Sequence, residues 1–82
     1  MQPQYIVIGK DYCSFCAKAK QLLNEHSIPF TYRDTSEVNK SDVEALEKIA
    51  GTQFVTVPQI FKYKPGGGLD YIGGFTDLEK LF

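Results

Sequence analysis

The sequence predicts an α/β fold in which one mixed four-stranded sheet carries helices on both faces. Short runs of β-branched and aromatic residues alternate with longer helix-forming segments, in the order β-α-β-α-β-β-α. The first expected strand, residues 4–9, lacks the alternation of a half-exposed strand and is typical of one covered on both faces. No repeat or linker divides the 82 residues, so we expect a single domain over residues 1–82.

The first half of the chain predicts a right-handed β-α-β unit. The strand over residues 4–9 ends at a glycine, and residues 14–25 are strong helix formers. Residues 27–29, Ser-Ile-Pro, end this helix, and residues 30–34 form the second strand, parallel to the first. The apolar face of the helix is formed by Cys16, Ala19, Leu22 and Leu23.

A second amphipathic helix follows. The segment Ser41-Asp-Val-Glu44 is a capping-box pattern, so we expect the helix to begin there. Leu46 and Ile49 share one helical face with Val43. Gly51 stands where a C-terminal cap belongs.

The last third predicts a hairpin and a short helix. Residues 56–63 form the third strand, and Pro58 is tolerated only at its start or on a sheet edge. A glycine-rich turn leads to the fourth strand, residues 69–72. Thr76-Asp-Leu-Glu79 is a second capping box, which opens a helix that runs to Phe82.

Composition excludes several classes of protein. Apolar residues make up 43% and charged residues 23%, with a net charge of -1, which gives no electrostatic footprint for nucleic acid or an anionic membrane. No apolar run is long enough to span a bilayer. The start, Met1-Gln2-Pro3-Gln4, has neither the basic nor the apolar region of a signal peptide, so we expect a cytoplasmic protein.

The motif Cys13-Ser-Phe-Cys16 lies where the first strand leads into the first helix. The amino end of a helix exposes unpaired N–H groups and partial positive charge, which favour a thiolate. Cys13 occupies this end, whereas Cys16 lies one turn further in and is expected to be buried. The sequence therefore predicts thiol–disulfide exchange, in which Cys13 attacks and Cys16 displaces the product.

Three other interpretations of the two cysteines remain. They could form half of a zinc site, although His26 is the only histidine and no third cysteine exists. They could form a structural disulfide, although closing so short a loop stabilises little. Cys16 could also simply pack in the core. The position beside a β-α-β unit favours redox chemistry over all three.

Three motifs together resemble those of glutaredoxins. They are Lys10 with Cys13-Ser-Phe-Cys16, Thr56-Val-Pro58, and Gly73-Gly-Phe-Thr-Asp-Leu78. The resemblance covers nearly the whole chain and implies a thioredoxin fold, with a cis peptide bond before Pro58. It also implies a glutathione-dependent oxidoreductase that reduces protein disulfides and glutathione mixed disulfides.

The resemblance further implies where glutathione binds. Lys10 would hold the glycyl carboxylate, Thr76 the γ-glutamyl carboxylate and Asp77 the ammonium group, while the Val57 backbone would pair with the cysteinyl part. Lys10 could instead be an ordinary solvated lysine, and Thr76 and Asp77 could serve only as helix-end groups. The implied glutathione-binding set is Lys10, Tyr12, Phe15, Gln53, Thr56, Val57, Pro58, Gly74, Thr76 and Asp77.

The sequence departs from the family pattern in two places. Many dithiol glutaredoxins have proline and tyrosine between the cysteines, where this chain has Ser14 and Phe15. The approach to Thr-Val-Pro, residues 51–56, is about two residues longer than usual. These departures bear on the redox potential and on one wall of the implied glutathione-binding groove, and not on the reaction class.

We therefore expect a monomer with no bound cofactor or metal and with glutathione as its reducing co-substrate. Its expected partners are glutathione and disulfide-containing or glutathionylated proteins, with ribonucleotide reductase as one candidate. Two alternatives remain. One is a glutaredoxin-like redoxin that donates electrons to ribonucleotide reductase and is reduced by a flavoprotein. The other is a carrier in which two chains share a [2Fe–2S] cluster through Cys13 and glutathione.

Overall fold

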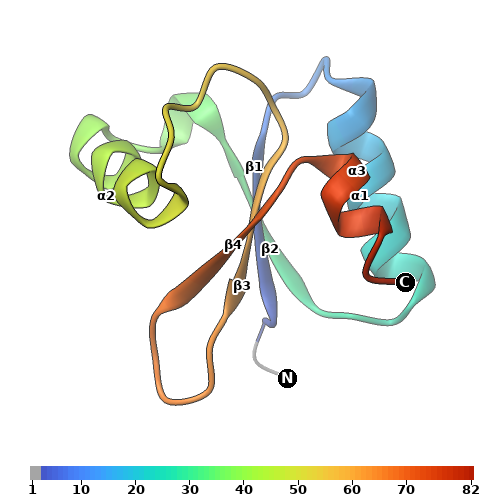
Figure 1. The fold of residues 1–82 in the computed structure, drawn as a ribbon. Helices are drawn as coiled ribbons and strands as arrows, with labels where there is room; N and C mark the ends of the chain where they lie inside the picture. The colour runs from blue at the N-terminus through green and yellow to red at the C-terminus, as the bar shows by residue number, and fades with distance from the viewer. Residues whose placement is uncertain (1–2) are drawn as a thin grey trace.

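A computed structural model describes residues 3–82 and contains one mixed four-stranded sheet of order β2-β1-β3-β4 (Figure 1). The central strand β1 is parallel to β2 and antiparallel to β3, and β3 is antiparallel to β4. Met1 and Gln2, on which the argument against a signal peptide partly rests, lie outside the described residues. The strands are β1 Tyr5–Gly9, β2 Phe30–Asp34, β3 Gln59–Tyr63 and β4 Leu69–Gly73.

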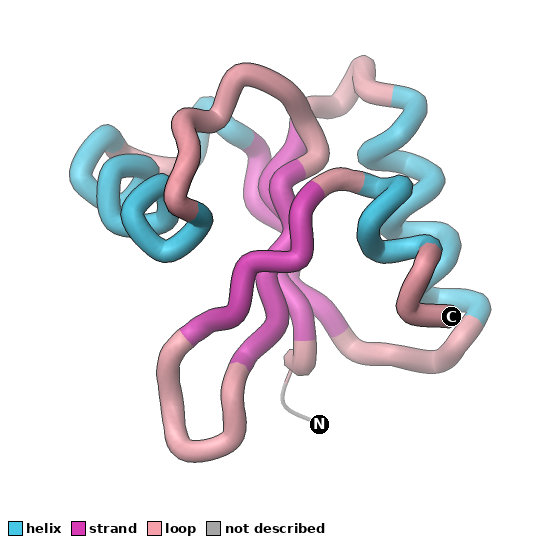
Figure 2. The backbone as a smooth tube through the Cα atoms, in the orientation of Figure 1, coloured by secondary structure: helices cyan, strands magenta, loops and turns pink. Residues whose placement is uncertain are grey.

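The helices cover both faces of the sheet, as predicted. Helices α1 and α3 pack on each other and on one face, while α2 lies on the other (Figures 1 and 2). The observed element order and the α/β class match the prediction. None of the helices within residues 3–82 is long and apolar enough to cross a membrane. The helices are α1 Ser14–Glu25, α2 Lys40–Ala50 and α3 Phe75–Glu79, with the 3-10 turn η1 Thr35–Glu37 before α2.

The cap of α2 differs from the prediction. The helix begins at Lys40, and its N-cap is Asn39, whose Oδ1 accepts the Asp42 N–H at 2.9 Å. Ser41 lies inside the first turn and donates its hydroxyl to the same Asn39 oxygen at 2.8 Å. Asparagine is as good an N-cap as serine, and Asn39 has the extended backbone that the cap position requires. At the other end, Gly51 adopts the left-handed conformation expected of a C-terminal cap (φ 75°).

The cap of α3 was also predicted in the wrong place. Gly74 is the N-cap, and Asp77 Oδ2 accepts its N–H at 3.2 Å, so Thr76 is the second residue of the helix. The helix ends at Glu79 and not at Phe82. Leu81 and Phe82, which follow the helix, form tight turns instead, in which each N–H bonds the carbonyl three residues back.

Strand β3 begins three residues later than predicted. Thr56, Val57 and Pro58 precede it as a loop, and the Val57–Pro58 peptide bond is cis. Pro58 thus stands at the start of the strand, where its missing N–H costs no ladder hydrogen bond.

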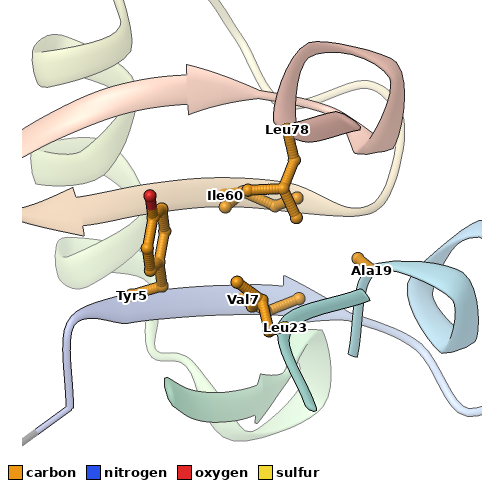
Figure 3. Close-up of a cluster of buried hydrophobic side chains, with 6 residues drawn as sticks. All are labelled: Tyr5, Val7, Ala19, Leu23, Ile60 and Leu78. Atoms are coloured by element: carbon orange, nitrogen blue, oxygen red, sulfur yellow. The ribbon is translucent and has the colours of Figure 1, made fainter. Parts of the chain in front are cut away.

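The main core lies between the sheet and the α1–α3 layer (Figure 3). Each of its members is at most 5% exposed, and they come from both strands and helices. Apolar burial of this completeness is the dominant stabilising term in a small domain. The core residues are Tyr5, Val7, Ala19, Leu23, Ile60 and Leu78.

Candidate active site

Cys13 is the N-cap of α1, as the sequence predicted. The chain turns after β1 so that the Cys13 N–H bonds the Lys10 carbonyl at 3.2 Å. Cys13 has extended backbone angles (φ -94°, ψ 114°), and its Sγ accepts the Cys16 N–H at 3.2 Å. The sulfur therefore lies at the positive end of the helix, partly exposed, with one backbone donor directed at it.

A segment distant in sequence lies beside this sulfur. The Cys13 thiol donates to the Val57 carbonyl at 3.5 Å, across 44 residues of chain. The loop before α1 and the loop before β3 meet at the same end of the sheet (Figure 2). The approach of Val57 to Cys13, which the family resemblance implied, is therefore present.

Cys16 is the buried member of the pair. Its side chain is 1% exposed, and burial raises the pKa of its thiol to about 11, with a smaller contribution from the hydrogen bond to Cys13. Both cysteines are free thiols. An ideal Cβ built on Gly9 would lie 2.6 Å from Cys16 Sγ, so the glycine makes room for the sulfur. This role of Gly9 was not predicted, because in the sequence the glycine marks only the end of a strand.

A groove of about 160 Å³ adjoins the Cys13 loop and contains seven of the ten predicted glutathione-binding residues. One wall is aromatic, because the Phe15 and Phe75 ring centroids are 6.1 Å apart. Phe75 was not predicted, although it lies within the Gly-Gly-x-x-Asp-Leu motif. The groove is lined by Phe15, Thr56, Val57, Pro58, Gly74, Phe75, Thr76 and Asp77.

The other three predicted residues lie outside this groove. Lys10 borders a second hollow of about 310 Å³, which it shares with Thr56 and Val57. Tyr12 is fully exposed in the loop before α1. Gln53 lines a separate surface hollow beside the end of α2, and this hollow includes no residue of the loop before α1. The structure therefore brings Lys10 next to the groove and leaves Gln53 away from it.

The two glycines before α3 have different tasks. Gly73 has a φ of 121°, and a Cβ there would collide with the Asp77 carboxylate. Gly74 has an ordinary negative φ, and its Cβ would meet only the Pro58 carbonyl at 3.7 Å. A side chain at Gly74 would thus make only an ordinary contact, whereas Gly73 is required by the backbone turn and by Asp77.

The polar groups at this end of the groove are exposed. The Asp77 carboxylate accepts the Gly74 N–H through one oxygen. The capping task therefore takes part of the hydrogen-bonding capacity of Asp77, and its second oxygen remains. Within residues 3–82, no group of three or more His, Cys, Asp or Glu side chains is placed to hold a metal ion.

Comparison with known proteins identifies the family. The glutaredoxin family model matches residues 6–64, which include Lys10, both cysteines and Pro58. Glutaredoxin 1 of Salmonella typhimurium is 35% identical over 81 residues, which cover 90% of this chain and 84% of that protein. The hybrid peroxiredoxin hyPrx5 of Haemophilus influenzae is 34% identical over 82 residues, which cover all of this chain but 30% of that protein.

A solved structure shares the fold. The buckwheat glutaredoxin–glutathione complex superposes with a TM-score of 0.70 at 24% identity, over 94% of this chain and 66% of that one. The topology, the cis bond before Pro58 and the family match agree with one another. The fold is the thioredoxin fold, and the chain belongs to the glutaredoxin family.

Proposed function

We propose that this protein is a glutathione-dependent thiol–disulfide oxidoreductase in which Cys13 is the nucleophile and Cys16 the resolving thiol. The observation that carries the proposal is the unequal placement of the two sulfurs. Cys13 Sγ is partly exposed at the end of α1 and accepts a backbone N–H, whereas Cys16 is buried one turn behind it. A thiolate is the attacking species in disulfide exchange, and only Cys13 is placed to meet a substrate.

The first reaction removes glutathione from a mixed disulfide. The Cys13 thiolate attacks the glutathionyl sulfur, a Cys13–glutathione disulfide forms, and the substrate leaves as a thiolate that takes a proton from solvent. A second glutathione thiolate then attacks the glutathionyl sulfur of this adduct. Oxidised glutathione leaves and Cys13 is restored. One free glutathione is consumed for each mixed disulfide, because the other half of the oxidised glutathione comes from the substrate, and Cys16 takes no part.

The second reaction reduces a protein disulfide and requires both cysteines. Cys13 attacks one substrate sulfur, and the other substrate sulfur leaves as a thiolate. Cys16, deprotonated, then attacks Cys13 Sγ, so that a Cys13–Cys16 disulfide forms and the substrate is released as a dithiol. Two glutathione molecules reduce the enzyme disulfide. The three-residue spacing on one helix places the two sulfurs within reach of each other.

The groove beside Cys13 supports glutathione as the co-substrate. Val57 presents backbone next to the Cys13 sulfur, where the cysteinyl part of the tripeptide would lie. Asp77 offers a carboxylate for the ammonium group and Thr76 a hydroxyl for the γ-glutamyl carboxylate, while Lys10 supplies a cation at the other end. The buckwheat protein, which shares this fold, forms a complex with glutathione.

The catalytic roles are tested with a coupled assay containing NADPH, glutathione reductase and a glutathionylated peptide. We expect Cys13→Ser to lose all activity. Cys16→Ser is the matched variant, because it removes the buried sulfur and leaves Cys13 intact. It should retain deglutathionylation and lose most protein-disulfide reduction. Full activity in Cys13→Ser would refute the proposal.

Glutathione recognition is tested separately with two lysine variants. Lys10→Ala should raise the KM for the glutathionylated peptide several-fold, because an exposed ion pair contributes roughly 0–1 kcal/mol. Lys62→Ala is the control, since Lys62 pairs with Tyr5 at the opposite end of β1. A mixed disulfide of the same peptide with mercaptoethanol lacks the carboxylates and should show no difference between the variants. Equal KM values for wild type and Lys10→Ala would remove Lys10 from the site.

A further inference from the structure

Tyr32 of β2 has a buried hydroxyl that the proposed exchange does not use. The hydroxyl oxygen is inaccessible to solvent, and no protein group within residues 3–82 forms a hydrogen bond with it. Buried side-chain polar atoms nearly always have a partner. The structure contains the dithiol form of the protein, so the missing partner can be a group that changes its state during the reaction.

The Tyr32 ring lies close to both Lys20 and Cys16. An ideal Cβ on Gly9 would be 2.6 Å from Cys16 Sγ and 3.4 Å from Tyr32 Cε1, so the sulfur and the ring border the same point. Lys20 Nζ lies 4.1 Å from the centroid of the Tyr32 ring. Lys20 is also one turn beyond Cys16 on α1, so both project toward the same part of β2. The three side chains therefore form a cluster behind the active-site loop.

We propose that Tyr32 is a positioning residue for the resolving step, and that its hydroxyl donates a hydrogen bond to Cys16 Sγ when this sulfur is a thiolate. The Lys20 ammonium adds positive charge above the ring. The inference rests on the roles proposed for Cys13 and Cys16. It explains why a hydroxyl without a partner is kept on a ring that borders the Cys16 thiol, which is itself a weak hydrogen-bonding group.

The step is balanced without a proton from tyrosine. The Cys16 thiol gives its proton to solvent, and its thiolate attacks Cys13 Sγ. The Cys13–Cys16 bond forms, the bond from Cys13 to the substrate sulfur breaks, and the released thiolate takes a proton from solvent. Tyr32 keeps its own proton throughout. The enzyme dithiol is oxidised by two electrons and the substrate disulfide is reduced by the same two.

The surroundings of Cys16 make such a donor useful. Burial and the hydrogen bond to Cys13 raise the pKa of Cys16, whereas a backbone hydrogen bond with Lys10 and, to a smaller extent, the charge of Lys20 lower it. Burial raises the pKa of Tyr32, and the charges of Cys16, Asp34 and Asp11 raise it further, so the tyrosine stays a protonated donor. A hydrogen bond to the charged form of Cys16 would favour the thiolate.

The test separates the two cysteine steps in time. Reduced protein is mixed with one equivalent of the symmetrical disulfide of nitrothiobenzoate, which releases a coloured thiolate at each step. The first release reports the attack by Cys13 and the second the attack by Cys16. We expect Tyr32→Phe to lower the ratio of second- to first-phase rates about tenfold at neutral pH. The pH profile of the second phase should move upward by about one unit, since a tenfold change corresponds to one pKa unit.

Two further variants make the result specific. Tyr71→Phe is the matched control, because it removes a strand tyrosine hydroxyl that already bonds Gln59 Oε1 at 2.7 Å. It should leave the ratio and the pH profile unchanged. Lys20→Met, which keeps the apolar stem, should shift the profile in the same direction as Tyr32→Phe but by less. Tyr32→Phe itself should fold normally, because it removes an unsatisfied group.

The outcomes distinguish this inference from the proposed function. The assay contains no glutathione, so a failure of glutathione dependence does not affect it. If Cys16→Ser still shows the second phase, the proposed roles of the cysteines are wrong. If Cys16→Ser loses the second phase while Tyr32→Phe keeps the wild-type ratio and pH profile, the roles stand and the inference about Tyr32 is overturned.

Discussion

The two faces of the sheet differ in how completely the apolar residues of their helices are buried. On the α1–α3 face, Leu23 and Leu78 are completely buried, and the strand residues that they cover are buried as well. On the α2 face, the helix contributes no fully buried residue, and its Ile49 is 46% exposed. Hollows of about 310 and 330 Å³ border α2, the first at Val43 and the second at Leu46 and Ile49.

The difference assigns separate tasks to the two faces. The well-packed face holds the cysteine-bearing helix against β1, so the position of Cys13 Sγ relative to Val57 is fixed by a full core. The loosely covered face supplies the hollow beside Lys10, where a surface can adapt to a ligand. A chain of this size buries a limited apolar area, and the core cluster of six residues supports the helix that carries the cysteines.

The largest expected effect on the free energy of unfolding comes from replacing one leucine on each face by alanine. Leu23→Ala should lower the free energy of unfolding by about 2–5 kcal/mol, because it leaves a cavity in a sealed core. Leu46→Ala on α2 should cost about 1 kcal/mol, since its side chain is only half-buried. Both changes are leucine to alanine within a helix, so helix propensity contributes equally. Urea denaturation measures both, and equal losses would mean that the faces are equivalent.

The second comparison is between alanine substitutions of Gly73 and Gly74, which lie at the junction of β4 and α3. Gly73→Ala should cost about 1–3 kcal/mol, because its φ of 121° is unfavourable with a Cβ and the new carbon meets Asp77. Gly74→Ala should cost less than about 1 kcal/mol, the usual difference between glycine and alanine at an N-cap. Thermal unfolding of the two variants gives the order. If Gly74→Ala is the less stable of the two variants, this account of the β4–α3 junction is contradicted.

The smallest effect concerns the start of α2. Because packing supports this helix weakly, its cap should matter measurably. Asn39→Ala should cost about 1 kcal/mol, since Asn39 Oδ1 bonds the Asp42 N–H. Ser41→Ala, the residue that the sequence pattern favoured, should cost less than about 0.5 kcal/mol. Denaturation that ranks the two in reverse would restore Ser41 as the cap.

The topology could be predicted from the sequence because its signals are local. The apolar run at β1, the helix formers of α1 and the glycine-rich turn before β4 each specify one element. The helix starts could not be predicted to the residue, because both Asn39 and Ser41 are good caps, and the extended backbone of Asn39 makes it the cap. Likewise, the backbone turn at Gly73, and not the composition, makes Gly74 the cap of α3.

The site was predictable to the extent that it follows from motifs. The cap position of Cys13 and the burial of Cys16 follow from their place after β1, and the groove unites the Thr-Val-Pro and Gly-Gly segments. The environment of Cys16 was not predictable, because Gly9, Lys20 and Tyr32 come from three separate elements with no shared pattern. Gln53 lies in a loop whose path depends on how α2 ends.

The measurement that tests the central claim most directly is alkylation of the reduced protein with iodoacetamide, followed by peptide mass spectrometry over a range of pH. We predict one adduct at neutral pH, on the partly exposed sulfur of Cys13. Cys16 should react only as the pH approaches its raised pKa of about 11, because below that value it is a buried, protonated thiol. Modification of Cys16 at the same rate as Cys13 at neutral pH would contradict the division of roles on which the proposed mechanism depends.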